Sequence, residues 1–341
     1  EVVCSNSFKS EDFNTSSGVL KEEMKLLDSL VLQVAQQTRV PAGNALAVDR
    51  NAFSSLITQR LEAFENFHRV AEVCDTLDAD GFDCVIVASG PLTDGALVPA
   101  LKEIFGRDFL YFFDAVAPIV TAESIDYDSA FVASRYGKGD ADYLNCPMNK
   151  EQYLQFYNAL VSAETVQLKD FENNVFEGCM PIEVMAKRGE DTMRFGPLKP
   201  VGLFDSRKTE KPYAVLQLRK ENRLGTLYNL VGFQTNLKFG EQKRVFSMIP
   251  ALKDAEFVRY GVMHRNTYLN APKFLNRYMQ LKSNPKLFFA GQITGVEGYM
   301  ESALSGIVAG IQAYRATKGL PFAGFPTETM TGALCEHVSS D

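Results

Sequence analysis

The stretch that decides the fold is residues 287–299, LFFAGQITGVEGY. An apolar run leads into a turn with glycine at positions 291, 295 and 298, and a segment rich in small residues follows at 299–315. This order predicts a buried strand, a glycine turn and a helix. Glycine lets a planar ligand or a phosphate approach the backbone, and the first N–H groups of the helix stabilise negative charge. An ordinary strand-to-helix turn has the same pattern, so the turn alone does not establish a ligand site.

Outward from this stretch, the chain shows two patterns. Residues 83–90 form a second candidate buried strand, and apolar residues at helical spacing predict helices at 20–37, 51–67 and 151–164. Between residues 171 and 268, aromatic-rich strand segments at 213–218 and 227–233 predict antiparallel sheet. The small residues Ala303, Gly306 and Ala309 would let the last helix lie close against a sheet. The sequence therefore predicts an α/β fold with an inserted α+β domain.

Length and composition exclude several classes of protein. The 341 residues are enough for two domains, and 46% hydrophobic with 23% charged residues is typical of a globular protein. No apolar run approaches the roughly 20 residues that span a bilayer, so we expect no membrane partner. The six cysteines are scattered without a C-x-x-C pair, which argues against a metal site and predicts reduced thiols in the cytoplasm.

The charge is unevenly distributed. Residues 181–290 hold 20 Lys/Arg against 9 Asp/Glu, whereas the rest of the chain holds 15 against 33. Such a split suggests a basic face for an anionic partner, although a solvated basic surface gives the same count. Aromatic residues interleave the cations, a combination that suits RNA better than duplex DNA. The candidate RNA contacts are Lys187, Arg188, Arg219, Lys220 and Arg223, and the interleaved aromatics are Phe195, Tyr213 and Tyr228.

Residues 290–299 resemble the C-terminal flavin-binding segment of the folate-dependent tRNA uracil-5-methyltransferases, and the larger flavoproteins that modify wobble uridines carry a looser version. Further segments resemble the methyltransferases in the same order along the chain. They are 3–7 (VCSNS), 40–50 (VPAGNALAVDR), 113–119 (FDAVAPI), 133–139 (ASRYGKG), 176–183 (FEGCMPIE), 226–235 (TLYNLVGFQT) and 259–266 (RYGVMHRN).

The chain departs from the family at one point. The family opens with a strand, a G-x-G-x-x-G turn and a helix that hold the pyrophosphate of the flavin, and this chain has no such fingerprint. The resemblance begins at Val2, just after the place of that turn, so we expect the chain to be cut short before Glu1 and leave open a second truncation after Asp341.

The resemblance implies a fold and an activity. It implies a Rossmann-like FAD-binding domain of residues 1–121 and 276–341, interrupted by an insertion domain of residues 122–275. It implies transfer of a one-carbon unit from methylenetetrahydrofolate to C5 of a uridine, with FAD as cofactor and NAD(P)H as reductant. The expected RNA is tRNA, at its T-loop uridine, or rRNA in one branch of the family. The oligomeric state and the choice between NADH and NADPH stay open.

Cys4 and Cys179 are the candidate catalytic thiols. A thiolate that adds to C6 of uracil makes C5 nucleophilic, and a base must later remove the C5 proton. Both cysteines lie in loop-like sequence, although an inert thiol is the default for any single cysteine. The resemblance places both at the functional cysteines of the family. Which one is the nucleophile, and which the base or the partner of the flavin-bound carbon, stays open, and we favour Cys179 as nucleophile.

The cofactor-binding candidates follow from the shape of the ligands. Folate is a planar pterin with a polyanionic tail, so its site needs a flat face, a polar group for the pterin edge and cations for the carboxylates. Each candidate taken singly is more often an ordinary polar residue. The candidates for FAD and folate are His264, Arg265, Asn266, Gly291, Gln292, Thr294, Gly295, Glu297, Gly298 and Tyr299.

Two other functions remain compatible with the sequence. One is a flavoprotein of the wobble-uridine type, which carries a long C-terminal helical extension that this chain lacks. The other is a non-catalytic RNA- or flavin-binding remnant, against which the presence of both Cys4 and Cys179 argues.

Overall fold

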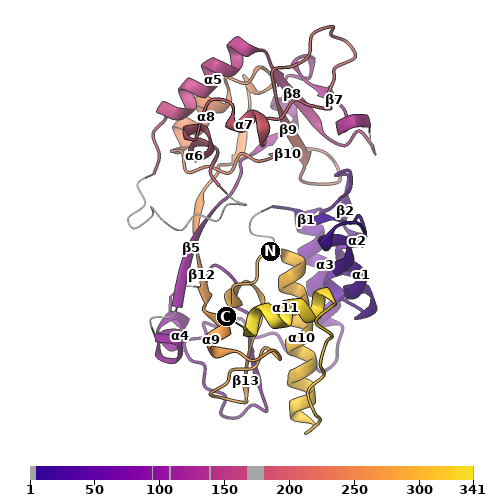
Figure 1. Ribbon diagram of the computed structural model, residues 1–341, viewed down its shortest axis with the longest axis vertical. Coiled ribbons are helices and arrows are strands. Elements are labelled where there is room, and N and C mark those ends of the chain that lie inside the picture. Colours follow the sequence, from indigo (N-terminus) through magenta and orange to yellow (C-terminus); the bar gives the residue numbers. More distant parts are fainter. Residues whose placement is uncertain (1–4, 94, 107–108, 138–139, 167–179, 341) are drawn as a thin grey trace. The chain divides into compact units, whose positions relative to one another are not determined.

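The structure is a computed structural model that describes residues 5–93, 95–106, 109–137, 140–166 and 180–340. The chain forms two compact units, each described here by itself (Figure 1). Unit 1 comprises Glu1–Ser7, Thr38–Ser54 and Phe113–His264, and unit 2 comprises Phe8–Gln37, Ser55–Phe112 and Arg265–Asp341. Strands β5 (Phe109–Ala115) and β12 (Met263–Leu269) pair with each other, and the chain passes between the units within them.

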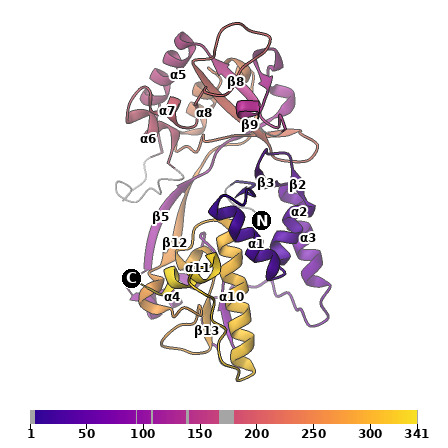
Figure 2. The same ribbon diagram turned by 45° about the vertical axis from the view of Figure 1, so that its right-hand side comes forward.

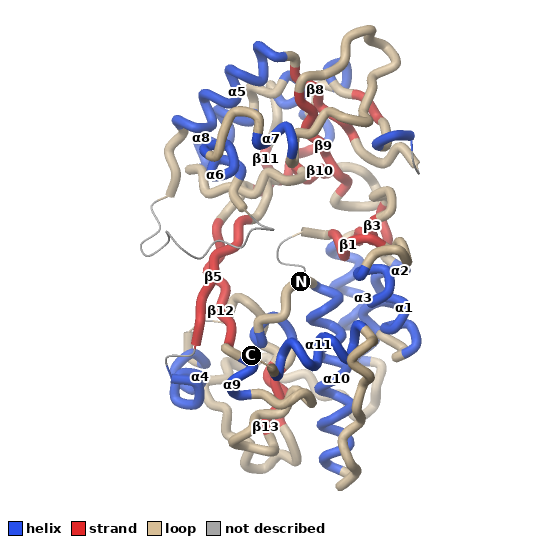
Figure 3. Tube along the Cα trace, viewed as in Figure 1, coloured by secondary structure: helices blue, strands red, loops and turns tan. Residues whose placement is uncertain are grey.

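Unit 1 is built on a six-stranded sheet with the order β11-β6-β10-β9-β8-β7. Figure 3 labels β8, β9, β10 and β11 of this sheet. Its neighbouring strands all pair antiparallel, as the strand-like, aromatic-rich sequence predicts. The central β9 places Leu216 opposite Cys146 of β8, and both side chains are fully buried. The strands are β6 (Ile119–Thr121), β7 (Phe131–Val132), β8 (Leu144–Met148), β9 (Ala214–Lys220), β10 (Leu227–Leu230) and β11 (Phe257–Arg259).

Helices cover one side of this sheet (Figures 1 and 2). The longest begins with a capping box, in which Asn149 and Gln152 satisfy each other's backbone N–H groups. Its apolar face buries Tyr153 and Phe156, and Phe156 stacks on Phe233 in the same core. The helices are α5 (Lys150–Ser162), α6 (Ile182–Lys187), α7 (Thr192–Phe195) and α8 (Phe239–Phe246), with 3-10 turns at Ala122–Ser124, Tyr127–Ser129, Arg135–Gly137 and Pro250–Leu252.

Residues 38–54 group with unit 1, whereas the sequence-based division placed them with the flavin domain. They form the hairpin of β2 (Arg39–Val40) and β3 (Ala45–Val48). The Gly43 N–H donates to Asp142 Oδ2 (2.7 Å), and Arg50 pairs with Glu221 (2.6 Å). These contacts join segments far apart in the chain, which no local pattern reveals. The unit boundaries at 113 and 265 lie near the expected crossings at 122 and 275, and the expected division into folding domains remains a prediction.

Unit 2 contains the predicted strand, glycine turn and helix. β13 (Leu287–Phe289) pairs parallel with β4 (Val85–Val87), and α10 (Tyr299–Thr317) follows the turn. The Glu23 carboxylate accepts from the N–H groups of Met330 and Thr331, which secures the start of α11. The other elements are β1 (Ser7–Ser10), α1 (Ser16–Leu26), α2 (Leu30–Gln37), α3 (Arg50–Glu62, which begins in unit 1), α4 (Leu97–Phe105), α9 (Ala271–Phe274) and α11 (Met330–Ser339).

Two sequence-based expectations about unit 2 were wrong. The helix expected at 20–37 is divided into α1 and α2, because Asp28 has a left-handed backbone (φ +54°) that an α-helix cannot contain. On α10, Ala309 is buried as expected, but a Cβ at Gly306 would meet no described atom within 4 Å. Among the helices of the described residues, none combines the length and apolar character needed to cross a membrane.

Candidate functional site

The glycine turn of unit 2 has a conformation that other residues adopt only with strain. Gly291, Gly295 and Gly298 have φ values of +77°, +82° and +105°. The Gly291 N–H donates to Ser305 Oγ (2.7 Å), and the Thr294 hydroxyl donates to the Gly291 carbonyl (2.8 Å). These bonds fix the turn to α10, so the backbone of the turn is held in place rather than adapting to a ligand.

The start of α10 offers an anion-binding backbone. Within the described residues no side chain caps α10, because Gly298 occupies the N-cap position. The first N–H groups of a helix have no partner inside the helix, and its dipole places positive charge there. A Cβ at Gly291 would meet no described atom within 4 Å, so the backbone there is open to close approach. The turn therefore fits a flavin, whose ring is planar and whose reduced form carries negative charge.

A charged pair lies beside this turn. Lys9 Nζ and Glu301 Oε1 are 2.6 Å apart, and a Cβ at Gly298 would come within 2.2 Å of Glu301 Oε2. Glu301 Oε2 is buried and has no hydrogen-bond partner among the described residues. The Tyr299 ring packs edge-on against Phe8, with centroids 5.2 Å apart. The Lys9–Glu301 pair could not be predicted from the sequence, because no local pattern signals an ion pair across 292 residues.

The segment after Arg265 runs next to the glycine turn. The side chains of His264 and Arg265 lie outside the described residues. Asn266 is buried, and the next residue, Thr267, hydrogen-bonds the carbonyls of Pro91 and Thr93. Burial and the nearby Glu297 carboxylate raise the pKa of Tyr268, whose ring lies 3.5 Å from the position of a Cβ on Gly295. The structure thus brings Tyr268, Gly295 and Glu297 together in unit 2.

Cys4 and Cys179 lie outside the described residues, but the residues that flank them are held in unit 1. Asn6, two positions after Cys4, is fully buried. Its Nδ2 donates to the carbonyls of Val48 (3.0 Å) and Lys220 (3.1 Å), and its Oδ1 accepts from Arg219 Nε (3.0 Å). One side chain therefore ties the Cys4 segment to two other parts of the chain.

The segment after Cys179 is anchored in the same unit. Met180 is buried, and the Ile182 N–H donates to the Gln234 carbonyl (2.7 Å). The Glu183 carboxylate accepts from Thr235 Oγ1 (2.9 Å) and from the Asn236 N–H (2.8 Å), and burial raises the pKa of Glu183. Both cysteine segments thus continue into buried, hydrogen-bonded residues of unit 1.

None of the other four cysteines has surroundings that would activate its thiol in the described residues. Burial raises the pKa of Cys146, and burial raises the pKa of Cys335 to about 11. Cys84, expected in a core strand, is only partly buried and directly precedes β4, with its pKa raised by burial and by Asp83. Cys74 is exposed. Across the described residues there is no cluster of three or more His, Cys, Asp or Glu suited to a metal ion.

The basic residues divide into exposed and buried ones. Lys187, Arg188 and Arg223 are exposed and Lys220 is partly buried. Arg219 is only 7% exposed and hydrogen-bonds Asn6, so its guanidinium is turned to the interior of unit 1 and supports the Cys4 segment.

The aromatic residues expected among these cations are mostly occupied. Tyr228 is buried in the sheet, and the Arg194 guanidinium covers the Tyr213 ring at 3.5 Å from its centroid. Of the three aromatic residues, Phe195 alone is largely exposed, at 81%. The expectation that Tyr213 and Tyr228 offer stacking faces to RNA was therefore wrong.

Known proteins match almost the whole chain. The family model described as glucose inhibited division protein A matches residues 1–321. A methylenetetrahydrofolate–tRNA-(uracil-5-)-methyltransferase TrmFO of Desulfitobacterium hafniense is 58% identical over 339 residues, which are 99% of this chain and 77% of the relative. The protein of the same name from Lactobacillus gasseri is 56% identical over 341 residues, with 100% and 77% coverage.

Solved structures support the fold. Two crystal forms of Aquifex aeolicus GidA match with a TM-score of 0.73 at 15% identity, covering 99% of this chain. The chain spans 61% and 63% of the length of those two chains, and at this identity the likeness concerns the fold alone. The predicted α/β class, a Rossmann-like domain with an insertion, is confirmed. The resemblance seen in the sequence is confirmed as well: the chain belongs to the family of the methylenetetrahydrofolate–tRNA-(uracil-5-)-methyltransferases.

Proposed function

We propose that the protein methylates C5 of a uridine in tRNA, with methylenetetrahydrofolate as carbon donor, FAD as bound cofactor and NAD(P)H as reductant. The observation that carries this proposal is the 58% identity over 99% of the chain to a methyltransferase with that donor and substrate in its name. The product is 5-methyluridine, and the proposed position is the T-loop uridine. We also propose a cytoplasmic location, in keeping with six cysteines that lack a C-x-x-C pair.

The glycine turn of unit 2 supports the flavin assignment. Gly291, Gly295 and Gly298 would accept the ring against bare backbone, and the start of α10 would stabilise its negative charge. When bound, the flavin supplies the electrons that reduce the transferred carbon to a methyl group. Gln292 and Thr294, which belong to the same turn, are proposed to contribute polar contacts.

The folate contacts are proposed from charge and position. Glu297, close enough to Tyr268 to raise its pKa, is proposed to accept hydrogen bonds from the pterin edge. His264, Arg265 and Asn266 lie two to four residues before Tyr268 in β12, and Arg265 is proposed to bind a carboxylate of the folate tail. Tyr299 contributes an aromatic edge, although its ring already contacts Phe8.

The two thiols are proposed to perform the uracil chemistry. The Cys179 thiolate adds to C6, which moves electron density to C5 so that C5 can attack the one-carbon unit. Cys4 then removes the C5 proton and the bond between the transferred carbon and its carrier nitrogen breaks. Once that carbon has been reduced to a methyl group, elimination of the Cys179 thiolate restores the C5=C6 double bond. Asn6 and Glu183, which follow the two cysteines in the chain, are hydrogen-bonded within unit 1, and this supports the assignment because a reacting group needs a neighbouring backbone that is held in place.

The test is formation of 5-methyluridine in an unmodified tRNA transcript, measured by mass spectrometry of the digested nucleosides. We expect product only when methylenetetrahydrofolate, NAD(P)H and FAD are all present. Replacing the T-loop uridine by cytidine should remove the product, which locates the methylated position. Flavin reduction without any methylated nucleoside, in tRNA or rRNA, would refute the proposal.

A further inference from the structure

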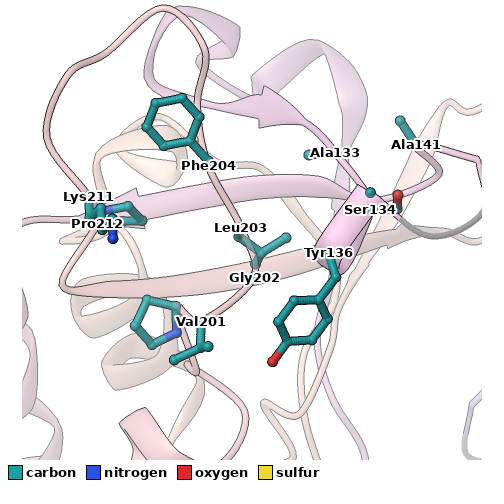
Figure 4. Close-up of a pocket in the computed structure, with 12 residues that line it drawn as sticks. Ala133, Ser134, Tyr136, Ala141, Val201, Gly202, Leu203, Phe204, Lys211 and Pro212 are labelled. Atoms are coloured by element: carbon teal, nitrogen blue, oxygen red, sulfur yellow. The ribbon is translucent and has the colours of Figure 1, made fainter.

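Unit 1 contains a cavity of about 840 Å³ that the proposed reaction does not use (Figure 4). It lies between the Arg135–Gly137 turn and the loop at residues 200–204. The residues that matter here are Tyr136, Val201, Gly202, Phe204 and Lys211. Its volume is within the range of sites for small planar ligands.

The two walls of this cavity are fastened to each other. Arg135 donates to the carbonyls of Lys199 (3.1 Å) and Val201, and to Gln217 Oε1 (3.2 Å). The Tyr136 N–H donates to the Gly202 carbonyl (2.7 Å). This partly buried network holds both walls in one arrangement, so the cavity is formed before any ligand arrives.

The backbone at Tyr136 has a left-handed conformation. Its dihedral angles (φ +60°, ψ 19°) are unusual for a residue other than Gly, Asn or Asp. Gly202, with φ +81°, faces it, and a Cβ there would come within 2.7 Å of the ring. Strained residues that the surrounding structure holds in place are concentrated at ligand sites.

Apolar side chains around this cavity are open to solvent. Tyr136 is 60% exposed and Phe204 is 52% exposed, although burial of such rings is favourable. Figure 4 shows the two rings rising from different segments, with Lys211 on the side away from Tyr136. Among the described residues that line the cavity, Lys211 is the only charged one. An exposed group of rings and one cation needs an explanation beyond packing.

We propose that this cavity binds an unpaired base of the RNA substrate, which contacts the rings of both Tyr136 and Phe204 while Lys211 contacts a neighbouring phosphate. The inference rests on the proposed function, because it concerns how the same enzyme holds its RNA. Every base has a flat face that stacks on an aromatic ring, whatever the sequence. Residues 181–264, the part of unit 1 that supplies Phe204 and Lys211, have 15 Lys/Arg against 9 Asp/Glu, so the charge of this segment favours a polyanion.

A nicotinamide dinucleotide fits this cavity less well. Its pyrophosphate carries two charges and is usually bound at the N-terminus of a helix after a glycine-rich turn. Among the lining residues described, the one cation Lys211 matches a single phosphate. The chemistry therefore favours one base with one phosphate.

The test measures the affinity of fluorescently labelled tRNA for the protein by anisotropy at several salt concentrations. Tyr136→Ala and Phe204→Ala should each weaken binding about 10-fold without changing the salt dependence. Lys211→Ala should lower the slope of log affinity against log salt by about one. Tyr136→Phe keeps the ring and should bind as the wild type does. Phe239→Ala is the matched control, since Phe239 is an exposed aromatic of the same unit that does not line the cavity.

The outcomes separate this inference from the proposed function. Wild-type affinity in both Tyr136→Ala and Phe204→Ala, in a protein that binds and methylates tRNA, overturns the inference alone. Weaker NADH binding in these variants with unchanged tRNA binding also overturns it and assigns the cavity to the dinucleotide. A wild type that binds no tRNA overturns the proposed function and the inference together. Phe204 lies in an exposed loop, so Phe204→Ala decides the question even if Tyr136→Ala does not fold.

Discussion

The glycine turn of unit 2 and the cysteine-bearing part of unit 1 are organised in opposite ways. The turn is local: β13, the three glycines and the start of α10 lie within residues 287–299. The cysteine-bearing part is assembled from distant segments, since Asn6 bonds Arg219 across 213 residues and Gly43 bonds Asp142 across 99. A local site tolerates change elsewhere in the chain, whereas an assembled site depends on each of its long-range bonds.

The largest effect is expected at the thiols. Cys179→Ala and Cys4→Ala should each lower methyl transfer by at least about 10³-fold, because each removes a group that forms or breaks a bond. The flavin absorbance should stay unchanged, since neither substitution alters the residues of the proposed flavin turn. Cys84→Ala is the control and should keep activity while it costs about 1 kcal/mol of stability. Full activity in both Cys4→Ala and Cys179→Ala would remove thiol catalysis from the account.

The local site has its own sharp test at Gly298. Gly298→Ala should lower stability by about 3 kcal/mol and reduce bound flavin, because φ is +105° and the new Cβ would lie 2.2 Å from Glu301. Gly306→Ala is the matched control on the same helix. It has helical backbone and open space for its Cβ, so thermal unfolding should show a gain of about 0.5–1 kcal/mol. Equal stability and equal flavin content of Gly298→Ala and Gly306→Ala would contradict the geometry of the turn.

The assembled site is tested at Asn6. Asn6→Ala leaves Arg219 without its acceptor and two carbonyls without their donor, so denaturant unfolding should show a loss of about 2–3 kcal/mol. Methyl transfer should fall by more than the loss of folded protein explains, because the Cys4 segment loses its anchor. Asn6→Asp keeps an acceptor for Arg219 and should lose less. Equal activity per folded molecule in Asn6→Ala and wild type would separate the anchor from the chemistry.

The smallest expected effect is a change of protein stability with pH, caused by Lys21 of unit 2. Lys21 is buried against Ser10 and Ser17, and burial lowers its pKa from 10.5 to about 8. Above pH 8 the unfolded chain then binds more protons than the folded one, so stability rises with pH up to the unfolded pKa. We expect a rise of about 1–2 kcal/mol between pH 8 and 9.5 in the wild type. In Lys21→Met the free energy of unfolding should no longer rise between pH 8 and 9.5. If the rise persists, another titrating group causes it.

The sequence predicted local structure well and contacts between distant segments poorly. The strand, turn and helix at 287–317 were predictable because glycine spacing and apolar runs act within a few residues. The break at Asp28 was missed because the apolar spacing of 20–37 continues through it. Neither the burial of Arg219 nor the facing pair of Tyr136 and Gly202 could be predicted, since both depend on contacts between distant segments. Family resemblance led to the proposal that Cys4 and Cys179 are the catalytic thiols, which residue patterns alone left open.

The central claim is that Cys179 attacks C6 of a uridine in tRNA, and a tRNA carrying 5-fluorouridine tests it most directly. Fluorine cannot leave C5 as a proton does, so a thiol adduct at C6 is trapped as a covalent protein–RNA complex visible on a denaturing gel. We predict a trapped complex in the wild type and in Cys4→Ala, and none in Cys179→Ala. A complex that survives in Cys179→Ala and vanishes in Cys4→Ala would contradict the assignment and exchange the two roles.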